Sequence, residues 1–477
     1  MGCPAASALR KRGATRMLPV ISRHLICPAH EWLLRRRTFR YLRELESSQW
    51  LSPDDLREVQ RVKLRALFGH ASANTVFYRR RFAEAGVDLP GGDPFEALRR
   101  LPLLSKKEIR ACGDAMLWHD APGGLFPHNT GGSTGDPLTF QVDRRRQGYD
   151  QAARFRTHRW FGVDVGDHEL YLWGSPIEAA GDGKLKRLRD RLFNHRLVNA
   201  FSMSCERMDE YLDVFDRFRP VCLFGYPSSI ALFVRHARAR GRRLDRSRLR
   251  AVFVTGEVCY AEQRESIASY FEVPVANGYG SREAGFIAHE CPQGGMHLTA
   301  ENVIVEIVGD DGSPLATGET GEIVVTHLDA YAMPFIRYRT GDVGRLKGGR
   351  CACGRGLAMM DVVQGRTTDF LYLPDGTVRH ALSIIYPLRE MAGVRQFRVT
   401  QQADYSVVVD VVADDGAERI TREGVARRLQ PVVGPGVELH VSLVDAIAAT
   451  NSGKHRYVVS HVPAELRGLP KEVGGGV

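Results

Sequence analysis

The sequence predicts an α/β protein with a large N-terminal domain of parallel-rich sheets, helices and a β-rich subdomain, followed by a small α+β C-terminal domain. From about residue 168 to 290, short apolar strands alternate with helical stretches, the pattern of a mostly parallel sheet covered by helices. From about 300 the strands are short and carry hairpin signals. A chain of 477 residues is longer than one hydrophobic core ordinarily serves, so more than one domain is expected. A composition of 43% apolar and 26% charged residues is typical of a soluble, folded protein.

The N-terminal part is expected to be helical after a basic leader. Residues 1–29 are basic and predicted to be poorly ordered, with Met17 as an alternative start. Helices are predicted over 41–85, where Ser52 suits an N-cap and Pro53 suits the first helical position.

Three apolar segments, ELYLWG (169–174), VCLFGY (221–226) and LRAVFVTG (249–256), are the expected strands of the parallel sheet. Each ends in glycine-bearing residues, and the carboxyl ends of such strands are where ligands bind in open α/β sheets. A smaller unit of strand and helix segments follows Gly365 and closes near residue 463, and a disordered tail is expected over 464–477.

Charge limits the classes of partner. Lys and Arg exceed Asp and Glu by 66 to 56, a net charge of +10 that favours anionic partners: ATP, coenzyme A, an acidic carrier protein, nucleic acid or an anionic membrane. The sequence contains no basic segment interleaved with aromatic residues of the kind that binds nucleic acid. No apolar run approaches the ~18 residues of a membrane span, and no secretory signal is evident, so a cytoplasmic protein is expected.

The stretch NTGGSTGDP at 129–137 is the first candidate site. Glycines let backbone N–H groups turn inward and hydroxyl groups add donors, so such a loop can hold phosphate oxygens. Taken alone, a polar surface turn is an equal alternative. It is not a Walker loop, since no lysine follows the glycines.

A second candidate is a metal centre. Nine scattered cysteines argue against a disulfide framework. Cys351 and Cys353 are spaced for one tight turn, and Cys291 and His297 lie six positions apart, together a Cys3His set suited to structural zinc. The alternative is a set of ordinary core residues. His289 is a weaker fifth candidate.

Four further stretches carry a family resemblance: NGYGSREAGFIAHEC (277–291), RYRTGDVG (337–344), QGRTTDF (364–370) and TNSGKHR (450–456). With the glycine loop, in this order and spacing, they resemble the core motifs of the adenylate-forming superfamily of acyl-CoA synthetases and peptide-synthetase adenylation domains. The chain is most similar to the phenylacetate-CoA ligase-like branch, and to its members associated with capsular polysaccharide biosynthesis. The similarity covers about residues 30–460 and implies an ATP- and acyl-binding domain over 30–364 and a small mobile C-terminal domain over 365–463.

The resemblance implies a role for each motif. Lys454 would neutralise the two anions that meet during adenylation, Thr134 would join it in catalysis, and Glu283 would bind Mg²⁺, a hard ion that prefers oxygen ligands. ATP would be held by the remaining motif residues: Thr130, Gly131, Gly132, Ser133, Gly135, Gly256, Glu257, Tyr279, Gly280, Asp342 and Arg366. Tyr279 would stack on adenine and Asp342 would bind the ribose hydroxyls. The acyl pocket would involve Phe224, Gly225, Tyr226, Pro227, Asn277 and Gly278, whose aromatic and apolar character favours an aryl or short acid.

The expected function is ATP-dependent activation of a carboxylic acid as acyl-AMP with release of pyrophosphate, then acyl transfer to coenzyme A, a carrier-protein thiol, an amine or a hydroxyl. Thr368 stands where many relatives have a pivot aspartate, and LYLPDGTVRHALS (371–383) replaces the segment linked to thioester formation, so coenzyme A is one acceptor among several. The alternative is a catalytically silent nucleotide-binding scaffold in a polysaccharide or secondary-metabolite assembly complex.

Overall fold

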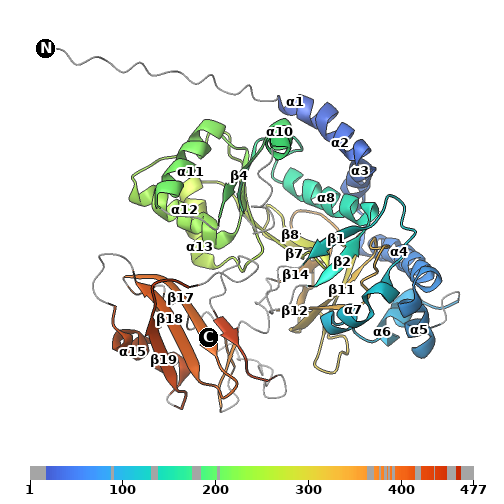
Figure 1. The fold of residues 1–477 in the computed structure, drawn as a ribbon. Helices are drawn as coiled ribbons and strands as arrows, with labels where there is room; N and C mark the ends of the chain where they lie inside the picture. Colours follow the sequence, from blue (N-terminus) through green and yellow to red (C-terminus); the bar gives the residue numbers. More distant parts are fainter. Residues whose placement is uncertain are drawn as a thin grey trace. The chain divides into compact units, whose positions relative to one another are not determined.

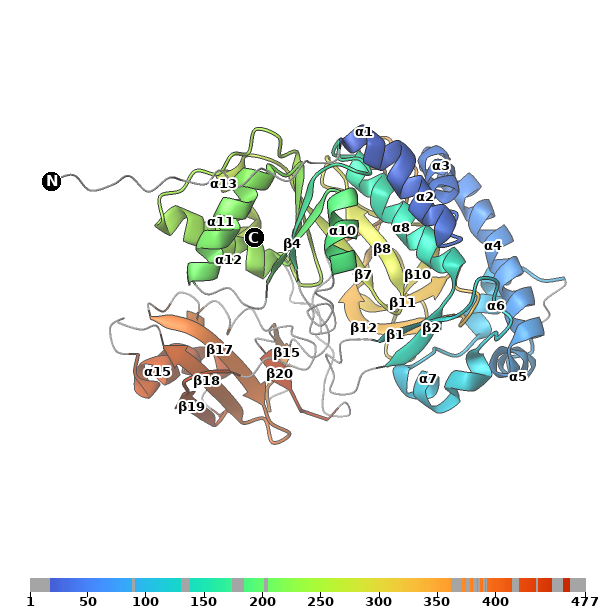
Figure 2. The ribbon, with the colours of Figure 1, turned by 45° about the horizontal axis from the view of Figure 1, so that its top comes forward.

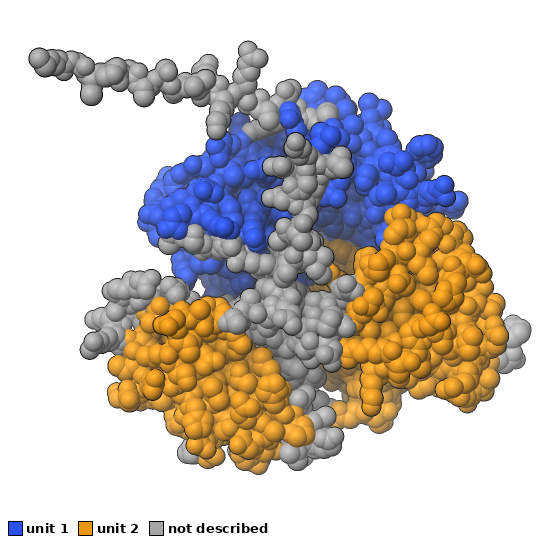
Figure 3. Space-filling view, in the orientation of Figure 1, with its two compact units in different colours: residues 1–46, 147–278, 290–294 blue, residues 47–146, 279–289, 295–477 orange. Residues whose placement is uncertain are grey.

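The computed structural model describes residues 18–87, 91–129, 138–173, 184–200, 205–361, 370–374, 378–380, 384, 387–388, 391, 393–413, 420–434, 436–447 and 458–463. The chain divides into two compact units, coloured separately in Figure 3. Unit 1 comprises residues 1–46, 147–278 and 290–294, and unit 2 comprises 47–146, 279–289 and 295–477. The boundaries of the predicted domains, 30–364 and 365–463, stay a prediction.

Unit 1 contains the parallel sheet that the strand pattern predicts. Its strands run in the order β4-β3-β5-β6-β7 and pair in parallel. Their bounds are β3 (Glu169–Trp173), β4 (His195–Asn199), β5 (Cys222–Gly225), β6 (Ala251–Thr255) and β7 (Val275–Ser281), the last crossing into unit 2. In β6, Ala251, Val252, Phe253 and Val254 are buried on both faces, which explains a continuous apolar run.

Helices cover this sheet (Figure 1): α8 (Arg144–Arg159), α10 (Lys184–Leu192), α11 (Cys205–Phe218), α12 (Pro227–Ala239) and α13 (Ala261–Phe271). The main core lies where the inner faces of α11, α12 and α13 meet the strands, around Phe215, Phe233, Val252 and Ile267. The crossovers alternate strand and helix, so all strand carboxyl ends share one edge.

The N-terminus of unit 1 is helical: α1 (Pro19–Ile21), a π-helical turn at Ser22–Ile26 and α2 (Cys27–Leu33), followed by α3 (Thr38–Ser48). Both views of the ribbon show these helices lying along α8 (Figure 1 and Figure 2). Residues 18–29 therefore differ from the poorly ordered segment expected over 1–29, because the apolar residues from Leu18 onward recur at helical spacing and Pro19 sits at the first helical position. Residues 1–17 lie outside the described residues.

Unit 2 begins with the predicted helices, α4 (Pro53–Asn74) and α5 (Val76–Glu84), then α6 (Pro94–Arg100), α7 (Lys106–Cys112) and a 3₁₀ turn at Gly113–Met116. The predicted N-cap is confirmed, since the Ser52 hydroxyl accepts a hydrogen bond from the Asp55 amide at 3.1 Å and Pro53 is the first helical residue. No helix in the described ranges is long and apolar enough to span a membrane.

The β-rich part of unit 2 lies in the region the hairpin signals predict. An antiparallel sheet joins β10 (Val303–Val308), β11 (Gly321–His327) and β12 (Tyr338–Gly344). β1 (Phe126–Asn129) pairs with β2 (Thr139–Val142). A further group runs in the order β8-β9-β14-β13, with bounds Gly285–Glu290, Met296–Leu298, Met359–Met360 and Leu346–Lys347.

The C-terminal residues form a strand and helix assembly with its own core. Strands β17 (Val394–Gln401), β18 (Val407–Ala413), β19 (Leu439–Leu443) and β20 (Val458–Ser460) form a sheet in the order β19-β18-β17-β20. Helix α15 (Arg422–Val433) places Val425, Leu429 and Val433 in the same apolar cluster as Val407, Val409 and Val411. A short hairpin joins β15 (Phe370–Tyr372) and β16 (Val378–His380).

Candidate active site and metal centre

Tyr279 and Asp342, predicted to bind the adenine and the ribose, lie together in unit 2. The Tyr279 hydroxyl donates to Oδ2 of Asp342 at 2.9 Å, although 63 residues separate them in the chain. Asp342 is 7% exposed and follows Gly341, whose φ is +74°. The β11–β12 register shifts between Glu322 and Val324, so this part of β12 is a bulge, which re-aims side chains out of the ladder.

Glu283, the predicted Mg²⁺ ligand, lies between β7 and β8 and is 5% exposed. Its Oε1 accepts from Lys106 Nζ at 3.0 Å and from the Tyr338 hydroxyl at 3.4 Å. Arg146 donates to the backbone carbonyls of Arg282 and Glu283, both at 2.7 Å. A buried carboxylate is therefore held in place and partly neutralised by a cation.

Lys106 was missed by the sequence reasoning. It is the first residue of α7, whose capping box links Ser105 and Glu108. The S-x-x-E pattern at 105–108 marks that helix start in the sequence. It carries no signal that Lys106 reaches Glu283.

The strands that flank the glycine loop are firmly paired. Asn129 at the end of β1 lies opposite Thr139 at the start of β2, and His128 lies opposite Phe140. The loop residues themselves, Thr130, Gly131, Gly132, Ser133, Thr134 and Gly135, lie outside the described residues. So do Arg366, Thr368 and Lys454.

In unit 1, the predicted acyl and nucleotide residues lie at the carboxyl ends of the parallel strands. Trp173 ends β3, and Tyr226 follows β5; their rings stack with centroids 4.0 Å apart and planes 15° apart. Gly256 follows β6 with φ +82°, and a Cβ there would stand 3.1 Å from Tyr226 and 3.4 Å from Trp173. The glycine is required for both its conformation and its approach to the rings. Glu257, next to it, is partly buried.

Pro227 is the first residue of α12, and Asn277 and Gly278 lie in β7. Thr255 donates to the Gly278 carbonyl at 2.7 Å. The backbone N–H of Asn277 donates to Oε2 of Glu290 at 2.7 Å. Arg264 Nη2 donates to both carboxylate oxygens of Glu290 at 2.9 Å. A Cβ atom at Gly280 in β7 would lie only 2.6 Å from the carbonyl oxygen of Gly285. The glycine therefore allows β7 to pass close to the start of β8.

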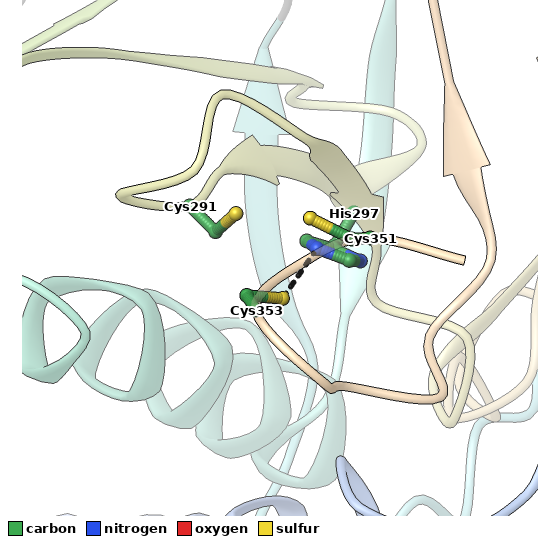
Figure 4. A group of neighbouring side chains, drawn as sticks. All are labelled: Cys291, His297, Cys351 and Cys353. Carbon is green, nitrogen blue, oxygen red and sulfur yellow. Dashed lines mark hydrogen bonds between the residues drawn. The ribbon is translucent and has the colours of Figure 1, made fainter.

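The proximity of the four predicted zinc ligands is confirmed. One ligand atom from each of Cys291, His297, Cys351 and Cys353 lies within 4.8 Å of the others. The sulfur atoms and the imidazole ring point toward one another, and Cys353 Sγ lies 3.2 Å from His297 Nε2 (Figure 4). Zinc bond lengths in a tetrahedral site place such donors about 3.5 Å apart, so the donor set fits the ion.

The supporting geometry matches that of a metal centre. Two tight turns carry the thiols, with Gly294 N donating to Cys291 O at 2.9 Å and Gly354 N to Cys351 O at 3.1 Å. His297 lies in β9, and its Nδ1 is 3.1 Å from the Leu357 carbonyl, which orients Nε2 toward the thiols. His289 is buried in β8, stacks on Phe286 and is outside this group of four.

A second cluster, His158, Glu169 and Cys222, is buried in unit 1. Glu169 pairs with Arg154 at 3.4 Å and accepts from the Tyr171 hydroxyl. Burial raises the pKa of the Cys222 thiol well above its usual range, so the thiol stays protonated. A protonated thiol is a poor metal ligand, and this cluster is a structural network of the core.

The chain is similar to a family of AMP-binding enzymes and to several ligases. A family model described as "AMP-binding enzyme" matches residues 198–329. A phenylacetate-coenzyme A ligase of Thermus thermophilus is 26% identical over 460 residues, 88% of this chain and 99% of the relative. Protein CapK of Staphylococcus aureus is 22% identical over 443 residues, 90% of this chain and 94% of the relative.

Among solved structures, a 2-hydroxyisobutyryl-CoA ligase in its postadenylation state superposes with a TM-score of 0.62 and 21% identity, covering 85% of this chain and 89% of that one. This likeness shows a shared fold. The family model and the ligases among the relatives indicate an acid-activating ligase of the adenylate-forming class. Within that class, the relatives found are phenylacetate-coenzyme A ligases and a CapK protein, so the chain is similar to the phenylacetate-CoA ligase-like branch.

Proposed function

We propose that the protein uses MgATP to convert a carboxylic acid into an acyl-adenylate with release of pyrophosphate, and then transfers the acyl group to a nucleophile. One observation carries the proposal. Two side-chain hydrogen bonds, Tyr279 to Asp342 and Tyr338 to Glu283, join the motif at 277–291 to the motif at 337–344. Tyr279 and Asp342, which the family resemblance assigns to the same nucleotide, are thus adjacent in unit 2.

Each side chain has a task that its chemistry supports. Asp342 offers carboxylate oxygens to the ribose hydroxyls, and the Tyr279 ring offers a face to adenine. The loop at 130–135 binds the β- and γ-phosphates through N–H groups and hydroxyls. Glu283 would hold Mg²⁺, which would supply positive charge at the triphosphate, and Lys106 pairs with that carboxylate and orients it.

In the first step, a carboxylate oxygen of the acid attacks the α-phosphorus, and the bond from that phosphorus to the pyrophosphate oxygen breaks. Two anions approach each other, and their repulsion in a site of low dielectric opposes the reaction. Lys454, in the motif TNSGKHR, supplies a mobile ammonium between them, delivered when the C-terminal domain closes.

The stacked Trp173 and Tyr226 at the strand ends support an aryl or short acyl acid as substrate. The faces of such rings bind an aromatic or compact apolar group. Acceptors remain coenzyme A, a carrier-protein thiol, an amine or a hydroxyl. The coenzyme A ligases among the relatives favour a thiol.

We also propose that zinc occupies the Cys3His site as a brace. All four protein positions of the tetrahedron are filled by side chains, as in structural rather than catalytic sites. The ion would tie the turn after β8 to the loop between β13 and β14.

Acid-dependent exchange of labelled pyrophosphate into ATP tests the adenylation step directly. Across a panel of aryl and short-chain acids, at least one acid is expected to support exchange, and Lys454→Ala is expected to abolish it. Lys107→Ala, in the α7 helix next to Lys106, is a matched control that should keep the exchange rate. Nucleotide binding without exchange for any acid would instead favour the scaffold.

A further inference from the structure

The helix from Pro19 to Leu33 presents its apolar side to solvent. Leu18, Leu25, Trp32 and Leu33 are between 64% and 79% exposed, and Ile21 is 36% exposed. Leu18, Ile21, Leu25 and Trp32 recur at intervals of three, four and seven residues across the π-helical turn at Ser22–Ile26, and their exposure places them on the solvent side of the helix. The buried residues of the same helix are Ser22, Cys27 and Glu31, of which two are polar. Most of its large apolar side chains therefore face solvent, unlike those of an ordinary surface helix.

Polar contacts within unit 1 hold this orientation. Arg23 donates to the Val165 carbonyl at 3.0 Å and pairs with Asp164 at 3.1 Å and Asp167 at 3.4 Å. Gly166, with φ +85°, stands so close that a Cβ would lie 2.9 Å from the Arg23 amide nitrogen and the Pro19 carbonyl oxygen. The helix is thus docked through its polar side, and rotation to bury the apolar stripe would break these contacts.

Further along the helix, His30 meets Phe193 edge to face at 4.9 Å, and Glu31 is held by Arg36 at 3.1 Å and by the Thr38 hydroxyl. These contacts neutralise the Glu31 carboxylate. Arg35 and Arg37, which follow the helix in sequence, are exposed, and the exposed Arg40 pairs with Glu44 at 2.8 Å.

The sequence that surrounds the stripe is rich in positive charge. Residues 1–43 contain ten Lys and Arg and a single acidic residue, Glu31, so they account for nine of the chain's ten net positive charges. The stripe is apolar, exposed and includes a tryptophan, and arginines precede and follow the helix in the sequence. This pattern is typical of a helix that lies in the plane of an anionic bilayer surface. A second copy on the same stripe would bring two such positive segments together, which their repulsion opposes.

We propose that the stripe formed by Leu18, Ile21, Leu25, Trp32 and Leu33 docks the protein on an anionic lipid surface. The apolar side chains enter the headgroup boundary while the arginines contact lipid phosphates. The enzyme would then act at a membrane without spanning it, with access to an acid or an acceptor of lipid character. This inference concerns unit 1 alone and holds whether or not the proposed adenylation occurs.

The test is co-sedimentation of the full chain with vesicles of phosphatidylcholine alone and of phosphatidylcholine with phosphatidylglycerol. Binding is expected only with the anionic lipid and should weaken as salt rises. Leu25→Ser with Trp32→Ser should lower the partition coefficient at least roughly tenfold, since two anchors leave the bilayer. Val62→Ser with Val76→Ser, at exposed positions in α4 and α5, is the matched control and should change nothing.

Tryptophan fluorescence and thermal unfolding distinguish a loss of lipid binding from a loss of folding. Trp32→Phe should retain binding but lose the lipid-induced blue shift of tryptophan fluorescence, and thermal unfolding should be the same for all variants because the altered side chains are exposed. The proposal is overturned if the wild-type chain ignores anionic vesicles, or if the control pair loses as much binding as the stripe pair. It is also overturned if the stripe variant converts a solution dimer to a monomer while vesicle binding is absent, because a second copy then covers the stripe.

Discussion

Replacing Asp342 by alanine should remove the enzyme's discrimination between ATP and 2′,3′-dideoxy-ATP. The proposed site gives the ribose hydroxyls one carboxylate acceptor, that of Asp342, which is 7% exposed and accepts a hydrogen bond from the Tyr279 hydroxyl at 2.9 Å. The wild-type enzyme loses these hydrogen bonds when the nucleotide lacks its hydroxyls. The Asp342→Ala enzyme has already lost them, so removing the hydroxyls costs nothing further.

The magnitude follows from the burial of the carboxylate. A hydrogen bond to a charged acceptor contributes about 1.5–3 kcal/mol, and solvent screening is small at so buried a group. Losing one such bond lowers kcat/KM for the nucleotide by roughly 10- to 150-fold, and losing two lowers it further. The wild-type preference for ATP over the dideoxy nucleotide should fall in that range, whereas in Asp342→Ala it should approach unity.

The assay is pyrophosphate exchange with each nucleotide, supplemented by calorimetric binding without acid where exchange is too slow. Tyr279→Phe is the matched control, because it removes the neighbouring hydrogen bond to the same carboxylate and keeps the aromatic ring. That variant should still prefer ATP strongly. A full preference for ATP in Asp342→Ala, with wild-type thermal stability, would refute the assignment of this carboxylate to the ribose.

Three further predictions concern the metal centre and the fold. Purified protein should carry about one equivalent of zinc by elemental analysis, and Cys353→Ser should lose most of it together with thermal stability, while Cys259→Ser, a buried thiol outside the cluster, should keep the metal. Gly225→Ala should lower the free energy of unfolding by about 1–3 kcal/mol in denaturant titration, since its Cβ would stand 2.4 Å from the Leu172 carbonyl oxygen; Gly69→Ala, with open space around it, should not. Burial, opposed by Arg337, raises the pKa of Glu306 above its ordinary 4.5 in the folded state, so the folded chain keeps a proton that the unfolded chain has lost, and stability falls as pH rises above about 4.5. Glu306→Gln lacks this loss, and an unfolding free energy that changes with pH equally in both proteins would contradict the assignment.

Several features of this fold are predictable because they depend on neighbours in the chain. The Ser52 cap and Pro53 start of α4 depend on local backbone chemistry, and the apolar runs of β3, β5 and β6 identify strands buried on both faces. The proximity of Cys291 to His297 and of Cys351 to Cys353 follows from tight turns. The pairing of these two clusters was a hypothesis until β9 and β14 were seen to align Met359 with His297.

The sequence by itself determined the fold class, the helix starts, the strand ends and the motif residues, because caps, periodicity and turn chemistry act over a few residues. Only the tertiary structure decided that Lys106 pairs with Glu283, that Tyr279 binds Asp342 across 63 residues, and that the helix from Pro19 to Leu33 faces its apolar side outward. The physical reason is that each of these depends on which surfaces meet when distant segments pack. A helical period shows that a stripe exists, whereas the contacts of Arg23 with Val165, Asp164 and Asp167 decide which side of the helix is buried.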